Sequence, residues 1–230
     1  SHFAHALLGC MADPAWIIPW DRLLAIPGQR LAVIEASGEV RFASTQLMRG
    51  VGRRSARAVA FSGLHAAFPA PLVDEFLGEV RRSFRDGRPT LLTGVIDGRR
   101  QGLAVYPLSS RSDAQRVLVA MFDSADWTPG AAPSPVFRTA ELGYATLGGL
   151  DRLSVRELDV LRAMGQGLPR KAIADRLRCP ARQAGAIARS LRAKLGHATD
   201  FRAAVEALHR GLPEVTDEHW DRIAFLRDAD

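Results

Sequence analysis

The chain has 230 residues, of which 47% are apolar and 24% charged, and this composition excludes an intrinsically disordered protein. No run approaches the roughly 18 apolar residues that a membrane helix needs, and no leader pattern is visible, so we expect a cytoplasmic protein without a membrane partner. The length suits two small domains, and the formal net charge of +6 favours an acidic partner.

The first segment, residues 3–27, alternates short apolar runs with prolines and predicts short, interrupted helices. Trp16 and Trp20 belong to an apolar cluster that must be covered. We leave two alternatives open: packing on the following domain, or a contact between two copies of the chain.

Residues 28–125 predict strands and helices in the order two strands, helices, three strands. The strands are expected at 30–36, 39–44, 90–96, 103–108 and 116–122. The longest helix is expected at 70–87, because Leu72, Phe76, Val80 and Phe84 recur every four residues before Gly87.

This order and its turns, such as Ser37-Gly38, resemble the PAS family of small sensor domains over residues 28–125. The resemblance implies an α+β domain with a five-stranded antiparallel sheet, in the order 2-1-5-4-3, and helices across one face. PAS domains hold a ligand between the sheet and the helices, or only dimerise.

The residues of this segment identify no cofactor. A ligand pocket, if present, is predicted to include a set of mostly apolar side chains: Phe42, His65, Phe76, Phe84, Val95, Val105 and Met121. A dry core, a small apolar ligand and haem on His65 remain alternatives. Cys10 and Cys179 are far apart and match no metal spacing, so we expect reduced thiols and no metal site.

Residues 126–150 are rich in proline, alanine and serine at their start and predict a linker. Three helices then follow within residues 151–205. Ser154 and Glu157 have the spacing of a capping box before a helix that ends near Gly165. Pro169 is typical of the start of the second helix, and residues 181–195 predict the third.

The pattern from Leu153 to Leu161, and the triplet Lys194-Leu195-Gly196, resemble the LuxR/GerE-type helix-turn-helix of bacterial transcription regulators. The resemblance covers residues 151–205 and implies an all-α DNA-binding domain. Base-edge contacts in that family come from positions that match Gly185, Ala186 and Arg189. Two of these positions carry almost no side chain here, so the usual reading residues are missing.

We therefore expect Arg189 to read guanine and Gln183 to read adenine. The expected phosphate contacts are basic side chains that position the domain without specifying a sequence: Arg170, Lys171, Arg182, Arg192 and Lys194. Residues 152–205 hold 12 Lys and Arg against 4 Asp and Glu, which favours double-stranded DNA as the partner. The alternative is an adaptor that has lost DNA binding and acts through protein contacts.

Residues 206–230 form an acidic helical extension, with Thr216 as the expected cap and with Trp220, Ile223 and Leu226 on one side. It either packs on its own domain or masks the reader or contacts a partner. No histidine pairs with a nucleophile or metal ligand set, so we expect no enzyme. The sequence predicts a homodimeric transcription regulator in which a sensor controls a DNA reader, with RNA polymerase or a regulatory protein as a further partner.

Overall fold

The computed structural model describes residues 30–44, 46–47, 63–108, 115–123 and 137–228. The chain divides into two compact units. Of the described residues, the first holds 30–44, 46–47, 63–93, 102–108, 115–122 and 137–142, and the second holds 94–101, 123 and 143–228. The helices expected at 3–27, with Trp16 and Trp20, lie outside the described residues. Among the described residues, no helix is long and apolar enough to cross a membrane.

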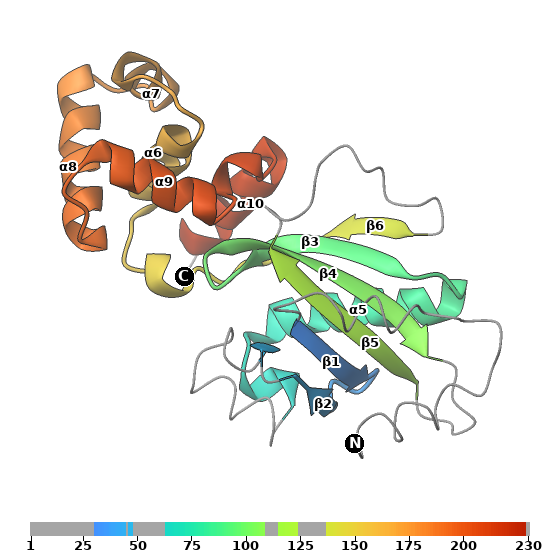
Figure 1. The fold of residues 1–230 in the computed structure, drawn as a ribbon. Coiled ribbons are helices and arrows are strands. Elements are labelled where there is room, and N and C mark those ends of the chain that lie inside the picture. Colours follow the sequence, from blue (N-terminus) through green and yellow to red (C-terminus); the bar gives the residue numbers. More distant parts are fainter. Residues whose placement is uncertain (1–29, 45, 48–62, 109–114, 124–136, 229–230) are drawn as a thin grey trace. The chain divides into compact units, whose positions relative to one another are not determined.

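The sheet contains six described strands. They are β1 (Arg30–Glu35), β2 (Val40–Ala43), β3 (Thr90–Ile96), β4 (Arg99–Leu108), β5 (Arg116–Asp123) and β6 (Arg138–Glu141). Their order is β2-β1-β5-β4-β3-β6. The first five strands therefore lie in the expected order, and Figure 1 shows them as neighbouring arrows.

The expectation of a purely antiparallel, five-stranded sheet is wrong. β6 adds to the outer edge of β3 in parallel, with Thr90 opposite Arg138 and Thr93 opposite Glu141. The strand lies within the segment predicted to be a linker. Short strands at a sheet edge are hard to predict because neighbouring strands supply their hydrogen bonds, and four residues carry little pattern of their own.

The helix α5 (Ala70–Asp86) lies across one face of the sheet (Figure 1). Its buried residues follow the helical spacing seen in the sequence, and Gly87 ends it in the left-handed conformation with φ of 61°. Glu79 of α5 is buried and forms an ion pair with Arg138 of β6. Strand β6 is thus held to α5 by an ion pair, in addition to its backbone pairing with β3. The short η1 (Leu64–Ala66) precedes α5.

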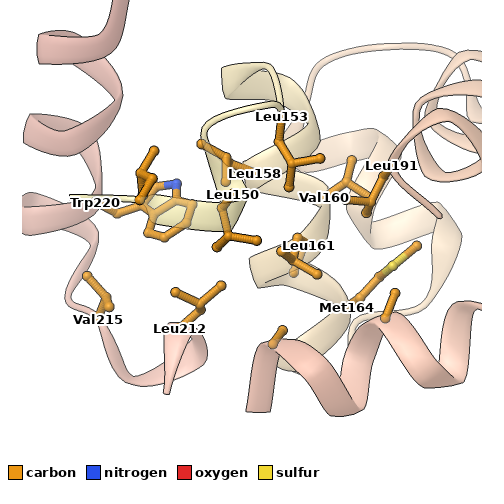
Figure 2. Packing of buried hydrophobic residues seen from close by; sticks show 14 of the residues in the cluster. Leu150, Leu153, Leu158, Val160, Leu161, Met164, Leu191, Leu212, Val215 and Trp220 are labelled. Atoms are coloured by element: carbon orange, nitrogen blue, oxygen red, sulfur yellow. The ribbon is translucent and has the colours of Figure 1, made fainter. Parts of the chain in front are cut away.

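The second unit is mainly helical. It contains η3 (Gly148–Leu150), α6 (Val155–Gly165), α7 (Arg170–Arg176), α8 (Ala181–Leu195), α9 (Asp200–His209), η4 (Leu212–Glu214) and α10 (Asp217–Asp228). One apolar cluster joins them, with Leu150, Leu153, Leu161, Leu191 and Leu212 fully buried (Figure 2). Each helix contributes apolar residues to this cluster, so their burial holds the unit together.

The tip of the β3–β4 hairpin, residues 94–101, belongs to this second unit. Val95 is fully buried in its cluster. The Gly98 N–H donates to the carbonyl of Thr146 (2.7 Å), and the Arg100 N–H donates to the carbonyl of Arg210 (2.7 Å), the residue that caps α9. Arg100 also forms an ion pair with Glu214 (2.9 Å). The hairpin tip therefore packs in the helical unit and satisfies the carbonyl of the residue that caps α9.

The described part of the C-terminal extension, residues 206–228, packs on its own unit. This was the first of the alternatives left open for it. The Thr216 hydroxyl accepts a hydrogen bond from the N–H of His219, so the expected cap is present. Trp220 is 4% exposed and donates from its indole to Asp159 of α6 (2.6 Å). The buried Arg162 lies over the Trp220 ring and pairs with Asp217. Figure 2 shows Trp220 within the apolar cluster. The side chain of Leu226 lies outside the described residues.

Candidate nucleic-acid interface

The capping box at the start of α6 is present as expected. The Ser154 hydroxyl accepts from the N–H of Glu157 (3.3 Å), and the Glu157 carboxylate accepts from the N–H of Ser154 (2.7 Å). Two backbone donors that the helix leaves unpaired are satisfied in this way. The position of α6 in the unit is therefore fixed from its first turn.

Glu157 also binds two side chains of α8. Its Oε1 accepts from the Ser190 hydroxyl (2.6 Å), and its Oε2 lies 2.7 Å from the Lys194 ammonium. The Glu157 side chain is only 6% exposed. Burial alone raises its pKa, but the hydrogen bonds from Lys194, Ser190 and Ser154 outweigh this and lower the pKa to about 2. Glu157 is thus a charged, fully partnered link between α6 and α8.

The turn between α7 and α8 is tight. Arg178 adopts a left-handed conformation with φ of 49°. The Cys179 N–H donates a hydrogen bond to the carbonyl of Ala174 (3.0 Å). Pro180 then precedes α8 in an extended conformation. The two helices are therefore joined by a short turn, residues 177–180.

The helix α8 has a buried side and an exposed side. Ala184, Ala188 and Leu191 are buried, and Ile187 and Leu195 are half-buried against the cluster, so this side of the helix is apolar. Arg182, Gln183, Ala186 and Arg189 are exposed. Gly185 is half-buried, and a Cβ atom there would meet nothing within 4 Å. On the exposed side, the long polar side chains are therefore separated by Gly185 and Ala186, which carry little or no side chain.

The seven cations and polar groups expected at DNA fall into two groups. Arg170 and Arg192 both pair with Asp200, at 2.8 and 3.0 Å, and Lys194 pairs with Glu157. Lys171, Arg182 and Arg189 are exposed and form no ion pair within the described part of the chain. Only this second group, with the exposed Gln183, presents side chains that are not already engaged with a carboxylate.

No pattern in the sequence indicates that two carboxylates, Glu157 and Asp200, divide the cations in this way. Glu157 was expected only as a cap, and Asp200 was not expected at all. Their partners lie 30 or more residues away in the chain, or 8 residues away across a helix end. Such pairs depend on the packing of three helices, which a single sequence does not show. Only the spacing of Ser154 and Glu157 could be recognised in advance.

The residues expected to line a ligand pocket do not all lie together. Phe76 and Val105 are buried, whereas Phe42, Phe84 and Met121 are half-buried. The side chain of His65 is 48% exposed, and its Nε2 lies 3.9 Å from Asp74. Val95 belongs to the apolar cluster of the second unit, so its placement in a sensor pocket is wrong. The described residues hold no group of three potential metal ligands.

No family model matches the chain, and no curated protein matches it. Solved structures that resemble it include the VqmA–ligand–DNA complex of Vibrio cholerae, with 16% identity, 89% of this chain and 92% of the other covered, and a TM-score of 0.42. The VqmA dimer without target DNA, described as a LuxR-type receptor, has 16% identity, 87% and 91% coverage and a TM-score of 0.34.

A domain of an HTR-like protein from Haloarcula marismortui has 13% identity, 42% and 97% coverage and a TM-score of 0.38. At these identities and TM-scores the likenesses add no weight to a functional assignment. The residues of the chain itself therefore carry the assignment.

Proposed function

We propose that the chain is a bacterial transcription regulator whose second unit binds double-stranded DNA through α7 and α8. The observation that carries the proposal is the exposed row on these helices: Lys171, Arg182, Gln183 and Arg189. Arg182 and Arg189 are seven residues apart on α8, so they lie on the same side at a spacing of about 10 Å along the axis. Cations spaced along one helix side suit a groove with phosphates at its borders.

Each of these side chains has a separate role in the proposal. Arg189 donates two hydrogen bonds to a guanine edge, and Gln183 pairs with adenine. Lys171 and Arg182 bind phosphates and fix the orientation of the domain. Gly185 and Ala186 supply no hydrogen bond, so they allow close approach but discriminate little between bases. The reader is thus expected to have a short recognition sequence.

The domain organisation is part of the proposal. Residues 28–125 form a sensor that responds to a signal or partner, and residues 151–205 form the reader, with 206–230 as its structural extension. Two copies of the chain bind paired half-sites, as a homodimer in the cytoplasm, and contact RNA polymerase or a regulatory protein there. The strand order of the first unit and the helix-turn-helix pair of the second support this division.

Titration against genomic DNA fragments tests the proposal. We expect the wild-type chain to bind a subset of fragments selectively. Arg189→Ala should weaken that binding by about 5- to 150-fold, which corresponds to the loss of one bidentate base contact. Arg202→Ala is the matched control, because Arg202 is also exposed but lies on α9. Absence of binding even at low salt would favour the adaptor.

A further inference from the structure

The C-terminal half of α8 is held by a buried carboxylate. Glu157 receives three donors: the N–H of Ser154 and the ammonium of Lys194 on one oxygen, and the hydroxyl of Ser190 on the other. Ser190 and Lys194 lie one turn apart on α8. Two contacts at this spacing fix both the rotation of the helix about its axis and its position along it.

Removal of one partner from this cluster would leave a buried charge only partly compensated. Such uncompensated charges are strongly unfavourable in proteins, so the Lys194 ammonium is held where it is. A DNA phosphate would have to compete with a carboxylate that already binds Lys194 at 2.7 Å. The position of Lys194 thus favours an internal role over a contact with DNA.

A second carboxylate holds α8 independently of Glu157 and also contacts α7. Asp200, at the start of α9, pairs with Arg192 of α8 and with Arg170 at the start of α7. Arg192 also donates to the carbonyl of Ala198 (2.8 Å). Both reading helices are therefore connected by charge to the helices that flank them.

We propose that Lys194 is a positioning residue, which acts through Glu157 to set the rotation of α8, and is not a phosphate contact. The inference rests on the proposed function and deepens it. Ser190 directly follows Arg189 in the chain, and successive residues of a helix are 100° apart. A rotation of α8 that released Ser190 and Lys194 from Glu157 would therefore also rotate Arg189 and Arg182, so that they no longer point in the direction needed to contact DNA. Sequence selectivity depends on the cluster, whereas general attraction to DNA does not.

The only two lysines of the chain provide a matched pair of variants. Lys194→Met and Lys171→Met each remove one positive charge and keep an unbranched side chain. The full-length proteins are titrated against a duplex selected from random sequences with the wild-type chain, and against a random duplex, over a series of salt concentrations. The slope of log affinity against log salt reports the number of phosphates contacted.

Lys171→Met should reduce the magnitude of this slope by about 0.9 for each reader bound and weaken both duplexes alike. Lys194→Met should leave the slope unchanged and lower the ratio of selected to random affinity by about tenfold, the effect of one lost charge-assisted hydrogen bond. Lys194→Arg, which keeps a cation for Glu157, should recover most of the selectivity. A slope reduced by Lys194→Met as by Lys171→Met would overturn the inference.

A second variant guards against misfolding. Glu157→Gln removes a negative charge and keeps every cation, so simple electrostatics predicts equal or tighter DNA binding, whereas the positioning role predicts lost selectivity. Hydrogen exchange of the free proteins gives a readout without DNA: α8 amides should exchange faster in Lys194→Met and not in Lys171→Met. Unchanged exchange would contradict the inference. A wild-type chain that binds no DNA would instead refute the proposed function.

Discussion

At the scale of single residues, Glu157 combines a local and a long-range role. Its spacing from Ser154 made the capping box predictable, because both groups lie within one helical turn. Its contacts with Ser190 and Lys194 cross from α6 to α8 and were not predictable from spacing. Lys194, expected at a phosphate, pairs instead with a carboxylate of its own unit.

The acid sensitivity of the fold should depend on Glu157. Its pKa is lowered from an ordinary value of 4.5 to about 2 in the folded chain. The charged carboxylate therefore contributes stability that is complete above about pH 4.5 and is lost as the pH falls toward 2. Urea unfolding at a series of pH values should show a smaller loss across this window for Glu157→Gln than for the wild type.

Glu218→Gln is the control for this experiment, since Glu218 is exposed in the first turn of α10. It should unfold with the pH dependence of the wild type. Equal pH dependence in Glu157→Gln and the wild type would show that the carboxylate is not held as the structure describes.

Trp220 provides a second test at this scale. It is buried in the apolar cluster, bonded to Asp159 and stacked by Arg162. Trp220→Ala should lower the free energy of unfolding by about 3–5 kcal/mol, as expected for a large buried aromatic side chain. Denaturation followed by circular dichroism measures the change. A loss of under 1 kcal/mol would mean that α10 does not belong to the core.

At the scale of elements, the tip of the β3–β4 hairpin is the least expected feature. The Asp97-Gly98 pair is typical of a turn, and Gly98 has φ of +67°. Its docking was not predictable, because Gly98, Arg100 and Val95 meet partners about 50 to 115 residues further along the chain. A hairpin that appears in the sequence as part of the sensor contributes its tip to the helical unit.

Two glycines separate the effect of backbone conformation from that of packing. Gly167 and Gly98 both have positive φ, but a Cβ at Gly167 would meet nothing within 4 Å, whereas one at Gly98 would lie 2.5 Å from the Leu147 carbonyl oxygen. Gly167→Ala should cost about 1–2 kcal/mol of stability. Gly98→Ala should cost about 2–5 kcal/mol, because overpacking adds to the backbone strain. Equal losses on urea unfolding would mean that the hairpin tip does not dock.

At the scale of the whole molecule, the sequence predicted the elements better than their long-range contacts. The five strands, α5 and the three helices from Val155 to Leu195 follow periodic patterns and appear where they were expected. The edge strand β6, the hairpin tip and the ion pairs of Asp200 depend on distant neighbours. The sequence predicted which side chains could contact DNA. Only the structure showed which of these cations are paired with a carboxylate and which are not.

The salt dependence of DNA binding by the full-length wild type tests the central claim most directly. The two phosphate-binding cations in each reader, Lys171 and Arg182, predict a log–log slope of about −2 for one reader and about −4 for a homodimer on paired half-sites. Binding with a slope in this range, and selective for some duplexes, would agree with a DNA reader in which Arg170, Arg192 and Lys194 are engaged with carboxylates of their own unit. No binding at low salt would contradict the claim, and the adaptor would then be the better account.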